Sequence, residues 1–188
     1  MSISDTGLFE ELRKIVSDDS ARIEKLQRVA ALIRNTGSYR WVGLYNVDQQ
    51  AGEVVNLVWD GPGAPEYPTF AIGKGLTGAA IRQRKVINVG DVASDPRYLT
   101  AFGSTRSEII VPIFDANRVK IVGTIDVESE RANAFEHREP VDRLRRRNGA
   151  VVGRELAVGD RWSVPRLRGR GEQGNIVTRT ACLSAPYW

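Results

Sequence analysis

Two stretches near the N-terminus place apolar residues at intervals of three and four, which is the spacing of one face of an amphipathic helix. The first stretch covers residues 6–16, and the second covers residues 20–35 and ends at Asn35-Thr36-Gly37. Because each predicted helix has a single apolar face, both need a flat surface elsewhere in the chain to pack against.

The pattern then changes to runs rich in β-branched and aromatic residues, which are typical of strands. Two such runs, 39–47 and 53–59, predict a hairpin, and Pro and Gly make 61–69 and 91–105 long loops. The same reasoning predicts a short helix and three further strands, at 76–84, 86–89, 107–114 and 119–127. Helices followed by paired strands indicate an α+β domain with an antiparallel sheet, which we place at residues 1–136.

The regular pattern decays after residue 136. Apolar residues keep a partial helical spacing over 140–156, but Gly149, Gly153 and Arg145-Arg146-Arg147 interrupt it. We expect 137–188 to be an Arg-rich segment that is partly helical and then disordered. Three origins stay open for it: an arm for nucleic acid or an acidic partner, a flexible extension, and a change of reading frame near residue 136. The last two are favoured over the first.

Charge supports that division of the chain. The formal net charge is +4, but residues 1–135 carry 16 basic and 17 acidic residues, whereas residues 136–188 carry 11 Arg and 6 acidic residues. The basic character therefore belongs to the C-terminal segment, and nucleic acid is not expected as a partner of the domain.

Composition excludes several classes of protein. One Cys and one His among 188 residues exclude a disulfide framework, a four-Cys zinc site and a multi-histidine metal centre. We expect no metal and no cofactor. No apolar run has the roughly 18 residues of a transmembrane helix, and there is no signal-peptide pattern, so a cytoplasmic protein without membrane contact is predicted.

Two residue pairs carry candidate chemistry. Asp126 and Glu128 are two apart on a predicted strand and share a face, as do Trp41 and Tyr45. Carboxylates beside aromatic rings suit an ammonium group. The alternatives are that the carboxylates lie on a solvated strand end, one of them paired with Arg106, and that the aromatic residues are core.

Four motifs in order resemble the GAF domain family, and among its members the free methionine-(R)-sulfoxide reductases most. They are Arg40-Trp41-Val42-Gly43-Leu44-Tyr45, Gly73-Lys74-Gly75-Leu76-Thr77-Gly78-Ala79-Ala80, Thr105-Arg106-Ser107-Glu108-Ile109-Ile110-Val111-Pro112, and Gly123-Thr124-Ile125-Asp126-Val127-Glu128-Ser129. The resemblance implies a central antiparallel sheet of about six strands. It also implies N-terminal helices on one face and a ligand pocket roofed by loops on the other.

The resemblance further implies a set of ligand-binding residues. Carried over position by position, they are Trp41, Tyr45, Thr77, Glu108, Asp126 and Glu128. The positions that hold cysteines in the reductases are Tyr67, Thr77 and Ala101 here. Reduction of a sulfoxide needs a thiolate and a resolving thiol, so no catalytic residue is assigned. The glycine-containing loop at 73–78 is interpreted as a tight entry into a helix, in preference to a phosphate cradle.

These observations predict a cytoplasmic sensory or binding module that recognises a small amine-bearing metabolite, with a homodimer or a partner protein carrying any signal. The alternative is an enzyme related to the methionine sulfoxide reductases.

Overall fold

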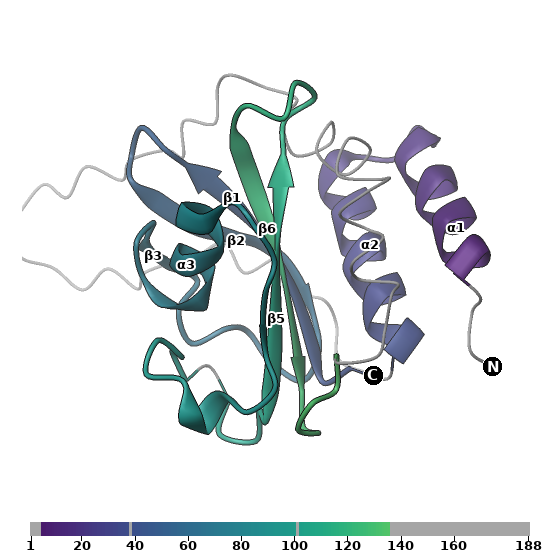
Figure 1. Ribbon diagram of the computed structural model, residues 1–188. Helices are drawn as coiled ribbons and strands as arrows, with labels where there is room; N and C mark the ends of the chain where they lie inside the picture. The colour runs from purple at the N-terminus through teal and green to yellow at the C-terminus, as the bar shows by residue number, and fades with distance from the viewer. Residues whose placement is uncertain (1–4, 38, 101, 136–188) are drawn as a thin grey trace, which may run out of the picture. The chain divides into compact units, whose positions relative to one another are not determined.

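The computed structural model describes residues 5–37, 39–100 and 102–135 (Figure 1). In chain order its elements are α1 (Asp5–Ser17), α2 (Arg22–Gly37), β1 (Trp41–Asp48), β2 (Glu53–Asp60), β3 (Thr69–Ala71), α3 (Gly75–Gln83), β4 (Ile87–Val89), the 3-10 turn η1 (Val92–Ser94), β5 (Ser107–Phe114) and β6 (Ile121–Ser129). The predicted segment 137–188 and the position of Ala101 lie outside the described residues, so the domain boundary at residue 136 stays a prediction.

The strands form one six-stranded antiparallel sheet in the order β3-β2-β1-β6-β5-β4, which confirms the predicted α+β architecture. β1 and β6 occupy the centre, because the N-terminal and C-terminal parts of the sheet meet there. One strand escaped prediction: β3 begins at the end of the expected loop 61–69. Its three residues gain their strand conformation by pairing with β2, where Phe70 lies opposite Val54, and not from a local pattern.

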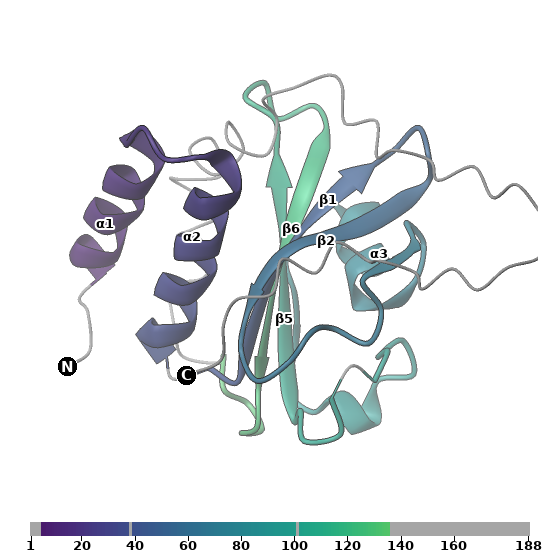
Figure 2. The same cartoon turned by 180° about the vertical axis from the view of Figure 1, so that it is seen from behind.

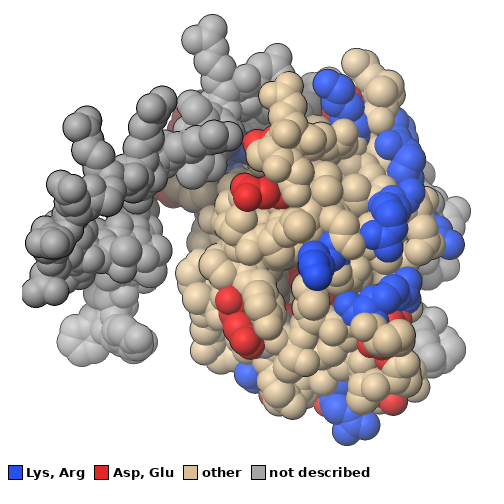
Figure 3. Space-filling model, turned by 90° about the vertical axis from the view of Figure 1, so that its left-hand side faces the viewer, with Lys and Arg blue, Asp and Glu red and all other residues tan. Residues whose placement is uncertain are grey.

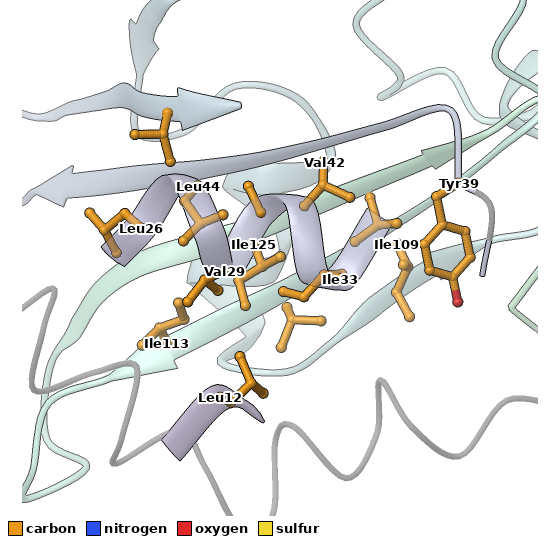
Figure 4. Packing of buried hydrophobic residues seen from close by; sticks show 14 of the residues in the cluster. Leu12, Leu26, Val29, Ile33, Tyr39, Val42, Leu44, Ile109, Ile113 and Ile125 are labelled. Atoms are coloured by element: carbon orange, nitrogen blue, oxygen red, sulfur yellow. The ribbon is translucent and has the colours of Figure 1, made fainter. Parts of the chain in front are cut away.

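The helix α2 packs against one face of the sheet, and α1 packs against α2 on the same side of the sheet (Figures 1 and 2). The apolar stripe of α2, which includes Leu26, Val29 and Ile33, lies over apolar residues of the central strands (Figure 4). Burying each such side chain contributes about 1.5–3 kcal/mol. This layer is the main hydrophobic core, so the predicted apolar helix faces have the covering surface that they require.

The opposite face of the sheet carries α3 and the long loops. All eight residues of β5 are buried, since alternate side chains face α1 and α2 on one side and α3 on the other. Two smaller clusters form on this second face, one around Leu76 of α3 and one around Trp41 of β1. Within the described part of the chain, no helix has the length and apolarity needed to cross a membrane.

Candidate ligand pocket

Three carboxylates meet on the α3 side of the sheet because of the strand register. Asp126 and Glu128 lie two residues apart on β6, and Glu108 on β5 pairs directly with Glu128. On the other side of β6, Trp41 pairs with Glu128 and Gly43 pairs with Asp126. The carboxylates are therefore nearest neighbours on one surface, as the resemblance implied.

These carboxyl groups are buried. Glu108 is 6%, Asp126 is 8% and Glu128 is 1% exposed, so the alternative of a solvated strand end does not hold. Arg106 is exposed and forms no ion pair with them in the described residues. Taking charged groups out of water without a counter-ion is costly. Burying these carboxyl groups in their charged form is therefore unfavourable, and contacts within the sheet do not offset that cost.

Burial raises the pKa values of the three carboxyl groups. Burial, and then the charges of Asp126 and Glu128, raise the pKa of Glu108 well above its usual range. Burial, and then the charge of Glu128, raise the pKa of Asp126, and the neighbouring Glu108 carboxyl partly opposes this rise. Burial raises the pKa of Glu128 to about 7, although a hydrogen bond from Thr105 and the charge of Arg40 lower it. The cluster thus retains protons near neutral pH.

One oxygen of the cluster has no partner. Asp126 Oδ1 is buried and accepts no hydrogen bond from any described residue. A buried oxygen in this state costs about 1–3 kcal/mol, and such atoms mark places where a ligand or a water molecule supplies the missing donor.

The carboxylates form the floor of a pocket of about 410 Å³, measured out to its open mouth. Its lining residues come from the sheet, from the first turn of α3 and from both long loops: Tyr45, Pro65, Tyr67, Phe70, Gly75, Leu76, Thr77, Leu99, Glu108, Asp126 and Glu128. Five of the six predicted ligand residues line it, and the sixth, Trp41, does not.

Aromatic rings form the pocket wall beside the carboxylates. Tyr45 meets Phe70 edge to face, with ring centroids 5.8 Å apart. Burial and the charges of Asp126, Glu128 and Glu108 raise the pKa of the Tyr45 phenol, so it stays neutral. A neutral phenol and a phenyl ring next to carboxylates provide the surroundings that a small organic cation prefers.

Trp41 holds the pocket roof in place. Its indole Nε1 donates a hydrogen bond of 3.0 Å to the carbonyl oxygen of Gly63 in the loop 61–69. Its ring also packs against Phe102 of the second loop, with centroids 5.6 Å apart. Trp41 therefore contacts both loops that cover the site, while its own role as a ligand contact stays a prediction.

Replacing this indole tests the anchoring role. Trp41→Phe should lower the free energy of unfolding by about 1 kcal/mol, because the hydrogen bond to Gly63 is lost. It should also speed amide hydrogen exchange over residues 61–69. Trp59→Phe is the matched control, since the Trp59 indole makes no hydrogen bond to another described residue. Equal exchange in both variants would argue against the anchor.

The loop at 73–78 is the entry into α3. Lys74 is the N-cap, has no capping side chain and precedes a turn that holds no acidic residue. The amide of Gly78 already bonds to the Lys74 carbonyl oxygen, but Gly75, Leu76 and Thr77 face the pocket. Free amides and the dipole at a helix N-terminus favour an electronegative group.

Several residues around the pocket had no signal in the local pattern. Pro65 and Leu99 come from the predicted long loops, Phe70 comes from the stretch between the loop 61–69 and the short helix, and nothing in their spacing indicates a shared wall. Thr105 precedes the Arg106-Ser107-Glu108 motif, but its bond to Glu128 depends on the pairing of β5 with β6. Among the described residues, no cluster of His, Cys, Asp and Glu has the arrangement of a metal site.

Comparison with known proteins agrees with this architecture. Residues 21–156 match the model of the GAF domain. The GAF domain-containing protein A of Dictyostelium discoideum is 29% identical over 130 residues, which are 69% of this chain and 79% of that protein. The free methionine-R-sulfoxide reductase of Saccharomyces cerevisiae is 32% identical over 97 residues, 52% of this chain and 53% of the yeast protein.

Among solved structures, the free methionine-R-sulfoxide reductase of Neisseria meningitidis in complex with its substrate has a TM-score of 0.65 at 26% identity. The similarity covers 81% of this chain and 83% of that one. The three cysteine positions of the reductase pattern hold other residues here, and the single cysteine, Cys182, lies outside the described residues. Tyr67 and Thr77 both line the pocket, so two of those positions are at the site.

Proposed function

Because the chain belongs to the GAF domain family, we propose that it is a sensory or binding module whose pocket takes a small amine-bearing metabolite. The supporting observation is the cluster of three buried carboxyl groups with an unpartnered Asp126 oxygen at the pocket floor. No Lys, Arg or His is among the residues that line this pocket. An ammonium group would supply both the missing hydrogen-bond donor and the missing positive charge.

The end of the pocket formed by the first turn of α3 favours a ligand that also carries a hydrogen-bond acceptor. The first turn of α3 presents Gly75, Leu76 and Thr77 to the cavity without a capping side chain. Its partial positive charge suits a carboxylate or another electronegative group. A molecule with an ammonium at one end and an acceptor at the other, such as a free amino acid, would match both ends of the site.

Calorimetry with a small panel tests this proposal. Free amino acids, simple amines and the corresponding carboxylic acids without an amine are titrated into the folded protein. We expect heat from at least one amine-bearing compound and none from the amine-free acids. Asp126→Asn should weaken binding at least tenfold, whereas Glu66→Gln, an exposed carboxyl in the roof loop, should leave it unchanged. Absence of heat from every amine would rule the proposal out.

Binding of an ammonium should also depend on pH. The cation favours ionised carboxylates, so it must displace protons that the empty pocket retains. Since the pKa of Glu128 is about 7, affinity should rise between pH 6 and pH 8, with protons released to the buffer. Titrations in two buffers of different ionisation enthalpy measure this release. Uptake of protons, or an affinity that falls over this range, would contradict it.

An enzyme related to the methionine sulfoxide reductases is the alternative function, favoured by the likeness to the yeast and Neisseria proteins. A reductase of this kind needs a thiolate at the pocket, whereas Tyr67 and Thr77 offer only hydroxyl groups. We expect no turnover of free methionine-(R)-sulfoxide in a thioredoxin-coupled assay that follows NADPH oxidation. Sustained turnover would show that the protein is a reductase.

A further inference from the structure

Two arginines share one aromatic ring on the α3 side of the molecule. The guanidinium carbon of Arg84 lies 5.0 Å from the centroid of the Phe114 ring, and that of Arg118 lies 4.8 Å from it. Arg84 follows the last residue of α3, and Arg118 belongs to the turn between β5 and β6. The ring therefore brings together two like charges from separate parts of the chain.

The backbone fixes this pair. Both arginines adopt left-handed backbone conformations, with φ of 53° for Arg84 and 58° for Arg118. Residues other than Gly rarely adopt this conformation. Arg84 Nη2 donates a hydrogen bond of 3.0 Å to the carbonyl oxygen of Arg118. Two turns and one hydrogen bond thus hold the guanidinium groups near one another before any partner arrives.

The surroundings leave the positive charge uncompensated. Lys85 and Lys120 are exposed next to the pair, and no described carboxylate forms an ion pair with any of these four side chains. The nearby Asp115 carboxylate is engaged within the turn, where its Oδ1 accepts a hydrogen bond from the Val119 amide. Lys and Arg side chains gather along one side of this face of the molecule (Figure 3).

An apolar residue stands in the middle of the charges. Val119 is 66% exposed between Arg118 and Lys120, the most exposed of the large apolar side chains in the described chain. Arginine is enriched at protein–protein contacts, and the exposed Val119 beside it offers a surface that an apolar side chain of a partner can cover. Phe114, in contrast, is only 6% exposed beneath the guanidinium groups and offers no free face on which a nucleic-acid base could stack.

We propose that Arg84, Lys85, Arg118, Val119 and Lys120 form a docking surface for an acidic segment of a partner protein, with carboxylates on the paired guanidinium groups and an apolar side chain on Val119. Planar guanidinium groups bind carboxylates through two parallel hydrogen bonds, which a lysine ammonium cannot do. The surface lies at the C-terminal end of α3 and on the turn between β5 and β6, whereas the pocket is lined by the first turn of α3, so the surface does not depend on what the pocket binds.

A short fluorescent peptide of alternating Glu and Leu residues probes this surface on the full chain. Arg84→Gln/Arg118→Gln should weaken its binding at least tenfold. Arg84→Lys/Arg118→Lys, which keeps the charge, should weaken it at least threefold. The control Arg13→Gln/Lys14→Gln removes the same charge from exposed positions of α1 and should change it by less than twofold.

Amide hydrogen exchange then locates the peptide. Protection at residues 84–85 and 115–120 is expected. Protection confined to residues beyond 136 would overturn the proposal, as would equal weakening in the α1 control. A DNA duplex or phosphatidylserine vesicles are titrated in parallel, and tighter binding of either one, with the same dependence on Arg84 and Arg118, would mean that the partner is not a protein.

Discussion

Glu128→Gln is expected to stabilise the ligand-free protein at pH 8 by about 3 kcal/mol and to leave its stability near pH 4.5 almost unchanged. The pKa of Glu128 is raised from 4.5 to about 7 by burial in the folded chain. Each unit of difference between folded and unfolded states corresponds to about 1.4 kcal/mol. Glutamine carries no charge at either pH and keeps an oxygen that can accept the hydrogen bond from Thr105.

The sign follows from proton binding. The folded protein holds a proton on Glu128 more tightly than the unfolded chain does, so this favourable contribution is complete below pH 4.5. It is lost as the pH rises through about 7. The free energy of unfolding of the original protein should therefore fall between pH 5 and pH 8, and that of Glu128→Gln should fall less.

Urea unfolding at the two pH values measures the effect, with Glu66→Gln as a control for an exposed carboxyl. The same Glu128→Gln protein should bind an amine-bearing ligand more weakly, because a charge that costs stability is the one that would hold the ammonium. A variant that is no more stable than the original at pH 8 would show that other groups already compensate the charge of Glu128 in the ligand-free protein.

Gly78→Ala should lower the free energy of unfolding by about 2 kcal/mol, although alanine is the better helix former by about 1 kcal/mol. A Cβ at residue 78 would lie 2.4 Å from the carbonyl carbon of Gly73, which is backbone and cannot rotate away. The start of α3 would have to move, and with it the pocket wall formed by Leu76 and Thr77.

The control for this variant lies in the same loop. A Cβ at Gly73 meets no atom within 4 Å. Gly73→Ala should therefore leave the protein equally stable or slightly more stable, since it restricts the unfolded chain. Thermal and urea unfolding of the two variants separate the outcomes, and a stabilised Gly78→Ala would show that helix propensity outweighs the contact.

The fold could be predicted largely because its pattern is local. Apolar spacing located α1 and α2, runs of β-branched and aromatic residues located the long strands, and the alternation along β6 placed Asp126 and Glu128 on one face. The edge strand β3 could not be found in this way, because three residues carry no period and depend on pairing with β2.

The site was predictable only in part, for a similar reason. The carboxylates of β6 follow from spacing, whereas their meeting with Glu108 depends on the register of β5, which the chain sequence does not display. Trp41 shares a face with Tyr45 as its spacing requires. Its indole nevertheless donates a hydrogen bond to Gly63 in a distant loop, and the spacing within the strand does not indicate this contact.

The buried carboxyl cluster also bears on how long the protein would last in a cell. Proteases attack molecules that have opened, and a ligand bound only by the folded form reduces the open fraction in proportion to its concentration over its Kd. If an ammonium compound neutralises Asp126 and Glu128, filled molecules would survive while empty ones are degraded. The amount of this protein would then follow the supply of the metabolite, without any change in the rate of its synthesis.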